Sequence, residues 1–317
     1  MQSLWMLVAT FMFSIMGVCV KIASDMYSVS EIVMYRGLVG TVVLGVLIVA
    51  RGGSFRTRLA WHHAWRGLIG VVSLWLWYWS IGKLPLATGM TLNYMSPIWI
   101  AAILFAAGWW RGQSRFEPGL TGAILCSFAG VTMLLQPAFH ADQWQAALAG
   151  LASGLISAIA YLQVRRLGLL GEPEYRVVFY FSLTGMLAGL AGAFVDGDGL
   201  RTLSLSSLGG QGVHGMKGWL LLLAIGVSAM VAQMAMTRAY RLGKTLVTAN
   251  LQYTGIVFSS AWGIVLWGDA LSLLAWCGIA VILGSGLAAT YYNTRVASVP
   301  AAKAKVTEAN DPIATEV

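Results

Sequence analysis

The chain has 317 residues, a formal net charge of +8 and a mean hydropathy of +0.74; 58% of its residues are hydrophobic and only 10% are charged. So few charged residues cannot cover a water-soluble globule of this length, and the composition therefore indicates a membrane protein. The basic residues lie between apolar segments and do not cluster as they do in nucleic-acid-binding proteins, so we expect no nucleic-acid partner.

Ten apolar segments follow one another along the chain. Each is close to the roughly 20 residues that a helix needs to cross the hydrocarbon core of a bilayer. They cover residues 3–21, 30–50, 66–82, 87–110, 118–136, 146–165, 176–195, 217–237, 246–267 and 270–292. The sequence therefore predicts an all-α integral membrane protein with ten transmembrane helices.

The charged residues between these segments predict the orientation. With the N-terminus in the cytoplasm, fifteen of the twenty arginines and lysines, Arg66 among them, fall on the cytoplasmic side, and four fall outside. Arg36 alone lies within a span. Such an excess on one side is typical of cytoplasmic loops. We therefore expect a multi-pass protein of the bacterial inner membrane with both termini in the cytoplasm.

A repeat divides the chain into two halves. Gly82-Lys83 corresponds to Gly243-Lys244, and Asn93-Tyr94, about ten residues further on, corresponds to Gln252-Tyr253. A repeat of this kind indicates two similar units. Because each unit holds an odd number of spans, the second unit enters the membrane in the opposite sense to the first.

We therefore predict two inverted five-helix repeats. The first covers residues 1–137 and the second covers residues 146–292. Residues 293–317 are polar and are expected to form a flexible cytoplasmic tail.

The two halves resemble the EamA-type repeats of the drug/metabolite transporter superfamily. The resemblance is carried by Gly82–Thr88 with Ser96-Pro97, by the counterpart at 243–253, and by Trp267–Asp269, although the family often has Glu where this chain has Asp269. It implies ten helices and alternating access around a central cavity. The implied substrates are amino acids, nucleotide sugars, riboflavin-like vitamins and other polar metabolites.

Pro97 predicts a kink in the fourth span. A proline has no backbone N–H, so the carbonyl of Asn93 loses its usual helical partner. That carbonyl and the Asn93 side chain could face a water-filled cavity, or neighbouring helices could repair the kink; the sequence leaves both open. In the ninth span Ile256 stands at the equivalent position, which predicts a less sharp bend.

Polar and aromatic side chains within the spans are the candidates for substrate binding. An amide in hydrocarbon is costly unless it is bonded, so several at similar depths favour a cavity lining. Arg36 could hold a substrate carboxylate or be a structural arginine, and Trp75 and Trp79, one turn apart, could line the cavity or belong to the interfacial aromatic belt. The full set is Arg36, Trp75, Trp79, Asn93, Tyr94, Ser96, Tyr161, Gln233, Asn250, Gln252 and Tyr253.

No residues arranged for catalysis, metal binding or a cofactor are visible. The four histidines lie in predicted loops, and the three cysteines lie singly within apolar spans. We therefore expect no enzyme, metal or cofactor, and a carrier that exports or exchanges a small amino-acid-like metabolite. An importer of a vitamin or nucleoside-like compound is the alternative, and a membrane assembly protein without transport is the alternative of another class. The lipid bilayer is an expected partner, and the glycine-rich spans also permit a homodimer.

Overall fold

The computed structural model describes residues 2–110, 118–135, 143–196, 215–243, 245–268, 270, 272–285 and 288, and the predicted tail at 293–317 lies outside these residues. All regular structure in the described residues is helical. The elements are η1 (Gln2–Leu4), α1 (Trp5–Ala23), α2 (Val29–Ala50), α3 (Ala60–Lys83), α4 (Leu86–Asn93), α5 (Ser96–Trp110), α6 (Pro118–Leu135), α7 (Trp144–Leu169), α8 (Glu174–Val195), α10 (Met216–Leu242), α11 (Thr245–Leu251), α12 (Thr254–Trp267) and an unlabelled helix, Leu273–Ser285.

The all-helical prediction is confirmed for this part of the chain. Each predicted span falls on one described helix, except that the fourth falls on α4 and α5 and the ninth on α11 and α12. Five helices, α1, α2, α7, α8 and α10, are long and apolar enough to cross a membrane. That all ten spans cross it, and that the halves are inverted, stays a prediction.

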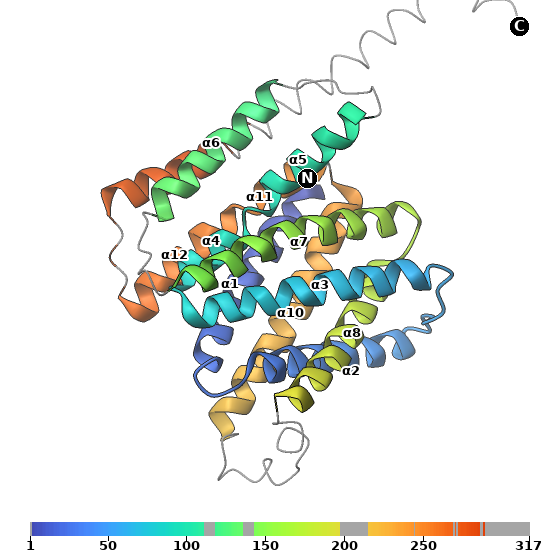
Figure 1. Ribbon diagram of the computed structural model, residues 1–317. Coiled ribbons are helices and arrows are strands. Elements are labelled where there is room, and N and C mark those ends of the chain that lie inside the picture. The colour runs from blue at the N-terminus through green and yellow to red at the C-terminus, as the bar shows by residue number, and fades with distance from the viewer. Residues whose placement is uncertain are drawn as a thin grey trace, which may run out of the picture.

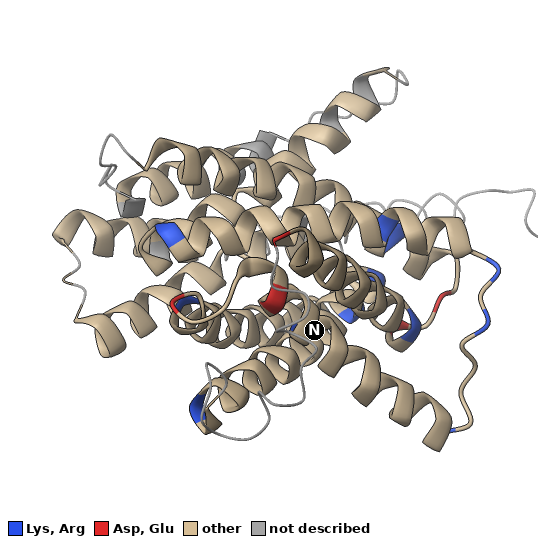
Figure 2. Ribbon diagram, turned by 60° about the horizontal axis from the view of Figure 1, so that its bottom comes forward, with Lys and Arg blue, Asp and Glu red and all other residues tan. Residues whose placement is uncertain are grey.

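The outer surface of the bundle is apolar. Val42 and Val46 on α2, Leu187 on α8 and Val265 on α12 are all more than half exposed, and Figure 2 shows long helical stretches that carry no charged residue. An exposed apolar surface of this extent is unfavourable in water and suits lipid chains. The fold thus agrees with a multi-pass membrane protein.

Helix ends are closed by side chains in the usual ways. At the start of α2, the hydroxyl of Ser28 accepts from the backbone N–H of Glu31 (3.3 Å), and the Glu31 carboxylate accepts from the backbone N–H of Ser28 (3.0 Å). At the end of α3, the ammonium of Lys21 donates to the carbonyls of Ile81 (3.0 Å) and Leu84 (2.8 Å). Both arrangements satisfy backbone groups that a helix end leaves without partners.

Three pairs of helices form the centre of the bundle. α2 packs along α8, α1 along α10, and α3 along α7, so each pair joins a helix of the first half to one of the second. α6 and the Leu273–Ser285 helix lie together at the opposite edge of the bundle from α2 and α8 (Figure 1), with Gly130 against the backbone of Gly278. The core therefore lies between the two halves.

The α2–α8 contact is backbone against backbone. A Cβ atom added to Gly37 would collide with the backbone of Ser182 and Met186, and one added to Gly189 would collide with the backbone of Ser30 and Met34. Only glycine permits so close an approach at these two positions.

Both half-helix pairs are interrupted by a two-residue turn. α4 ends at Asn93 and α5 begins at Ser96, which places Pro97 in the first turn of α5, where its missing N–H is tolerated. α11 ends at Leu251 and α12 begins at Thr254, although no proline follows. The second interruption thus occurs without a proline, and the relative sharpness of the two bends stays a prediction.

The second break has a local cause in its hydrogen bonds. The backbone N–H groups of Gln252 and Tyr253 donate to the carbonyls of Ala249 (3.1 Å) and Asn250 (3.1 Å), three residues back in place of the helical four. Gly255, two residues after Tyr253, packs directly on the ring of Tyr94 in the first break. The two breaks therefore lie against each other.

Candidate functional site

A small cavity of about 30 Å³ lies at the first break, between the two halves of the chain. This volume holds one or two water molecules, not a metabolite. It is lined by Phe13, Arg66, Gly70, Ser73, Leu74, Trp77, Asn93, Tyr94, Ser157, Ala160, Tyr161, Phe181 and Gln233. The lining thus combines one cation with amides, hydroxyls and aromatic rings.

Helix α3 contributes most of one wall. Arg66, Gly70, Ser73 and Trp77 follow one another at spacings of three or four residues, so they lie along one face of the helix. The opposite wall comes from the second half, with Tyr161 on α7. Residues of both halves are therefore needed to close the cavity.

Asn93, the last residue of α4, is held in a polar network at the cavity. Its side-chain N–H₂ donates to the hydroxyls of Ser153 (2.9 Å) and Ser157 (3.2 Å), and Ser73 on α3 bonds the hydroxyl of Ser157 (2.6 Å) and the carbonyl of Ser153 (2.8 Å). Gly154 lies between these serines, and a Cβ there would come within 2.8 Å of the carbonyl of Leu92. The small residues of α7 therefore bring it close to the break.

Four predicted site residues meet in the cavity lining: Asn93, Tyr94, Tyr161 and Gln233. They come from three different helices and from the break after α4. Their role in substrate binding stays a prediction.

The two tryptophans predicted on α3 lie elsewhere. Trp75 packs against Gly192 of α8, and Trp79 is 36% exposed on the outer surface. Trp77, which the sequence analysis did not select, lines the cavity in their place. Successive helical residues point about 100° apart, so Trp77 shares the face of Arg66 and Gly70, whereas its neighbours two positions away do not.

The predicted residues around the second break lie outside the lining, and the two amides among them bond to protein groups. Asn250 accepts from the hydroxyl of Ser127 (3.3 Å) and donates to the carbonyl of Ser285 (3.4 Å). Gln252 accepts from the hydroxyl of Ser96 (3.2 Å), which joins the two breaks. Tyr253 is fully buried at 1% exposure.

Two arginines lie beside the cavity. Arg66 lines it, and Arg36 on α2 lies next to it, because both guanidinium groups lie over the ring of Phe181 on α8, at 4.1 and 5.0 Å from its centre. The sequence analysis placed Arg66 among the charges at the membrane surface, but its side chain is only 2% exposed. The recurrence of Arg66, Gly70, Ser73 and Trp77 on one helical face was the signal that could have identified it.

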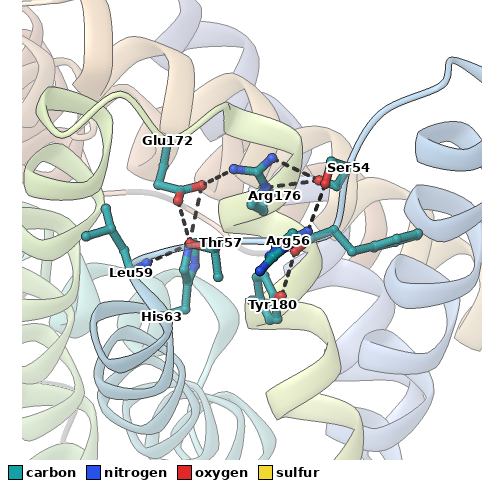
Figure 3. Close-up of polar contacts among 9 residues, drawn as sticks. Ser54, Arg56, Thr57, Leu59, His63, Glu172, Arg176 and Tyr180 are labelled. Carbon is teal, nitrogen blue, oxygen red and sulfur yellow. Dashed lines mark hydrogen bonds and ion pairs between the residues drawn. The ribbon is translucent and has the colours of Figure 1, made fainter.

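A second polar cluster, the Glu172 cluster, is drawn in Figure 3, and its His63 lies on α3 one helical turn before Arg66. It consists of Ser54, Thr57, His63, Glu172, Arg176 and Tyr180. Arg176 binds the Glu172 carboxylate (2.9 Å) and the carbonyl of Ser54 (2.9 Å), and Tyr180 lies against His63. The cluster therefore ties the segment between α2 and α3 to the turn between α7 and α8.

The ionisation of Glu172 reflects this pairing. Burial favours the neutral carboxyl group, but the hydrogen bonds from Thr57 and Arg176 and the nearby positive charge outweigh it. The pKa of Glu172 is therefore held below its usual value. Among the described residues, no group of three or more histidines, cysteines and carboxylates is placed to bind a metal.

Comparison with known proteins relates the chain to transporters. Residues 1–136 match the EamA-like transporter family. The pseudopaline exporter CntI of Pseudomonas aeruginosa is 29% identical over 275 residues, which cover 87% of this chain and 90% of that protein. A riboflavin transporter of Vibrio cholerae is 24% identical over 92% of this chain and 94% of its own.

Two further comparisons agree. An uncharacterized transporter of Helicobacter pylori is 27% identical over 89% of this chain and 91% of its own. A solved structure described only as "Crystal structure of protein" superposes with a TM-score of 0.69 at 20% identity, covering 93% of this chain and 98% of that one, and so shares the fold. The match of residues 1–136 to the EamA-like transporter family, together with relatives named as transporters, is consistent with the drug/metabolite transporter superfamily.

Proposed function

We propose that the chain is a carrier of the bacterial inner membrane that exports or exchanges an amino acid or amino-acid-like compound by alternating access. The observation that carries the proposal is the cavity between the halves, whose lining includes polar side chains from both. Arg66 and Asn93 reach it from the first half, and Tyr161 and Gln233 from the second. A site built from both halves changes its access when they move relative to each other.

The small size of the cavity supports a conformational change during transport. About 30 Å³ accommodates one or two waters. An amino acid enters only after the surrounding helices separate. The described conformation is then the closed member of an alternating pair.

The packing of the helices supports two equivalent five-helix repeats. Exchanging the halves converts the α1–α10 pair into the α7–α3 pair and leaves the α2–α8 pair unchanged. The glycine contacts show the same equivalence. Gly37 contacts Ser182 and Met186, and Gly189 contacts Ser30 and Met34; a shift of 152 residues relates 37 to 189, 34 to 186 and 30 to 182. The distribution of arginine and lysine supports cytoplasmic termini.

The relatives support export as the direction of transport and also suggest a second candidate function. The exporter among them favours export. The riboflavin transporter, together with the rings of Trp77, Tyr161 and Phe181 in the lining, favours an importer of a flat vitamin-like compound as the second candidate. The buried Arg66 in the lining favours a carrier over an assembly protein without transport.

Counterflow in liposomes tests the proposal. Purified full-length protein is reconstituted, the vesicles are loaded with one compound from a panel of amino acids and vitamins including riboflavin, and uptake of the labelled compound is measured. We expect counterflow for an amino-acid-like compound. Counterflow of riboflavin alone favours the second candidate, and counterflow of no compound contradicts the carrier.

Two neighbouring residues of α7 give a matched pair of variants. Ala160 lines the cavity, whereas Ile159 is 38% exposed on the outer surface. Ala160→Phe should fill the cavity and abolish counterflow, and Ile159→Phe should retain it. Unchanged counterflow in Ala160→Phe, in protein that elutes as a single folded species, contradicts the assignment of the cavity.

A further inference from the structure

Two arginines meet at one aromatic ring deep within the bundle. Arg66 on α3 and Arg36 on α2 are 2% and 3% exposed. Their guanidinium carbons lie 4.1 and 5.0 Å from the centre of the Phe181 ring. Two positive charges are thus concentrated beside the cavity.

Neither charge has a counter-ion within the part of the chain that the structure describes. The ion pairs found there join Glu172 to His63 and Arg176, and Glu174 to Arg241. Nε of Arg36 and both Nε and Nη1 of Arg66 are buried, and no described group accepts a hydrogen bond from them.

An unpaired buried guanidinium is unfavourable. Removing a charged group from water costs several kcal/mol unless an opposite charge and hydrogen bonds replace the lost hydration. Contact with an aromatic ring returns only about 2 kcal/mol even in a desolvated site. Phe181 therefore compensates these charges in part, and an oxyanion would supply what is missing.

We propose that Arg66, with Arg36 beside it, forms an anion subsite that binds a carboxylate of the transported metabolite. A carboxylate is planar and presents two oxygens, which match the fork of N–H donors on a guanidinium. A cavity with room for one or two waters accommodates such a group more readily than a larger tetrahedral anion. This subsite rests on the proposed transport function and narrows it to anionic or zwitterionic compounds.

Gly70 leaves the space that the Arg66 side chain occupies. The arginine side chain folds back along α3 over Gly70, and a Cβ at Gly70 would collide with Nη1 of Arg66 and with the Phe181 ring. Gly70→Ala therefore displaces the guanidinium without removing its charge. A subsite that depends on position as well as on charge loses affinity in this variant.

Ligand-induced thermal stabilisation of the purified full-length protein tests the subsite. The probes are glutarate, its neutral diamide glutaramide and inorganic phosphate, compared at equal ionic strength. We expect glutarate to raise the unfolding temperature and the other two to leave it unchanged. An equal effect of glutaramide overturns the anion subsite, and an effect of phosphate alone overturns the assignment to a carboxylate.

Variants of two arginines sharpen the test. Arg66→Gln should weaken glutarate binding by about 30-fold or more, the usual consequence of removing one partner of a buried charge pair. Arg238→Gln is the control, because Arg238 also lies over an aromatic ring, that of Trp5 at 4.8 Å, but is exposed. Equal weakening in the two variants contradicts a specific role for Arg66.

The stability of the ligand-free protein separates a binding arginine from a structural one. If Arg66 is unpaired without substrate, Arg66→Met removes an uncompensated charge and should raise the unfolding temperature. A structural arginine gives the opposite sign, because its loss leaves a partner unpaired. A lower unfolding temperature in Arg66→Met, with glutarate binding retained, overturns the proposal.

The counterflow panel separates the failure of the subsite from the failure of the transport function. Counterflow of a neutral metabolite without glutarate binding leaves the carrier standing and overturns the subsite. Glutarate binding that depends on Arg66, without counterflow of any compound, leaves the subsite standing and overturns the carrier.

Discussion

The two helix breaks occupy equivalent positions in the two predicted repeats, yet their side chains are used differently. At the first break, Asn93 and Tyr94 line the cavity. At the second, Asn250 and Gln252 bond to serines of neighbouring helices, as Asn93 does, but lie outside the lining. An interrupted helix thus exposes polar groups in both halves, but only one set faces the cavity. We infer that the first break serves recognition and the second serves packing.

The largest expected effect contrasts two asparagines. Asn93→Leu removes an amide from the cavity lining and should weaken substrate binding by about 100-fold, since a polar group of the substrate would be left without its partner in a buried site. Asn250→Leu removes an equally buried amide from the second break and should lower stability while leaving affinity within a few fold. Equilibrium binding of the compound found by counterflow measures both. Similar losses of affinity would mean that the two breaks share one role.

The next effect tests the close packing at the first break. Gly154→Val pushes α7 away from the carbonyls of Leu92 and Asn93, which should lower the free energy of unfolding by about 1–3 kcal/mol. The control is Gly284→Val, because a Cβ at Gly284 meets no atom within 4 Å. Thermal unfolding in detergent measures both variants. Equal shifts would show that α7 does not depend on glycine at this contact.

A smaller effect measures the connection between the breaks. Ser96 donates to Gln252 across the two halves (3.2 Å). In a double-mutant cycle with Ser96→Ala and Gln252→Leu, we expect a coupling of about 1 kcal/mol in the free energy of unfolding. Strict additivity of the two single changes would show that the breaks are energetically independent.

The smallest effect concerns a connection away from both breaks. Because the pKa of Glu172 is lower in the folded protein, its ionised form contributes stability above the usual glutamate pKa, and this contribution is lost as the pH falls through the lowered value. The unfolding temperature should therefore fall on acidification by less in Glu172→Gln than in the wild type. Glu174→Gln is the nearby control. An unchanged pH profile in Glu172→Gln would exclude a role of this carboxylate in stability.

The sequence was sufficient for the helices and for the first break. Apolar length predicts each span, and Pro97 predicts the interruption near Asn93, because both depend on local properties of the chain. The second break could not be predicted in this way. It lacks a proline, and the Gly255–Tyr94 contact beside it joins residues that are far apart in the sequence.

The cavity was predicted in part. Asn93, Tyr94, Tyr161 and Gln233 were identified because a polar group within an apolar span stands out. Arg66 was missed because it begins a span, where arginines are common at membrane surfaces. The amides of the second break were assigned to the cavity because the sequence does not reveal which polar partners face them.

The backbone contact between α2 and α8 limits how the halves can move. No side chain separates the helices at Gly37 and Gly189, so they cannot approach further, and separating them would open a gap that no group fills. A relative movement of the halves is therefore expected to be a rotation with this contact as its pivot. Displacements then grow with distance from α2 and α8. The broken helices, which lie further across the bundle (Figure 1), move more than the residues near this contact.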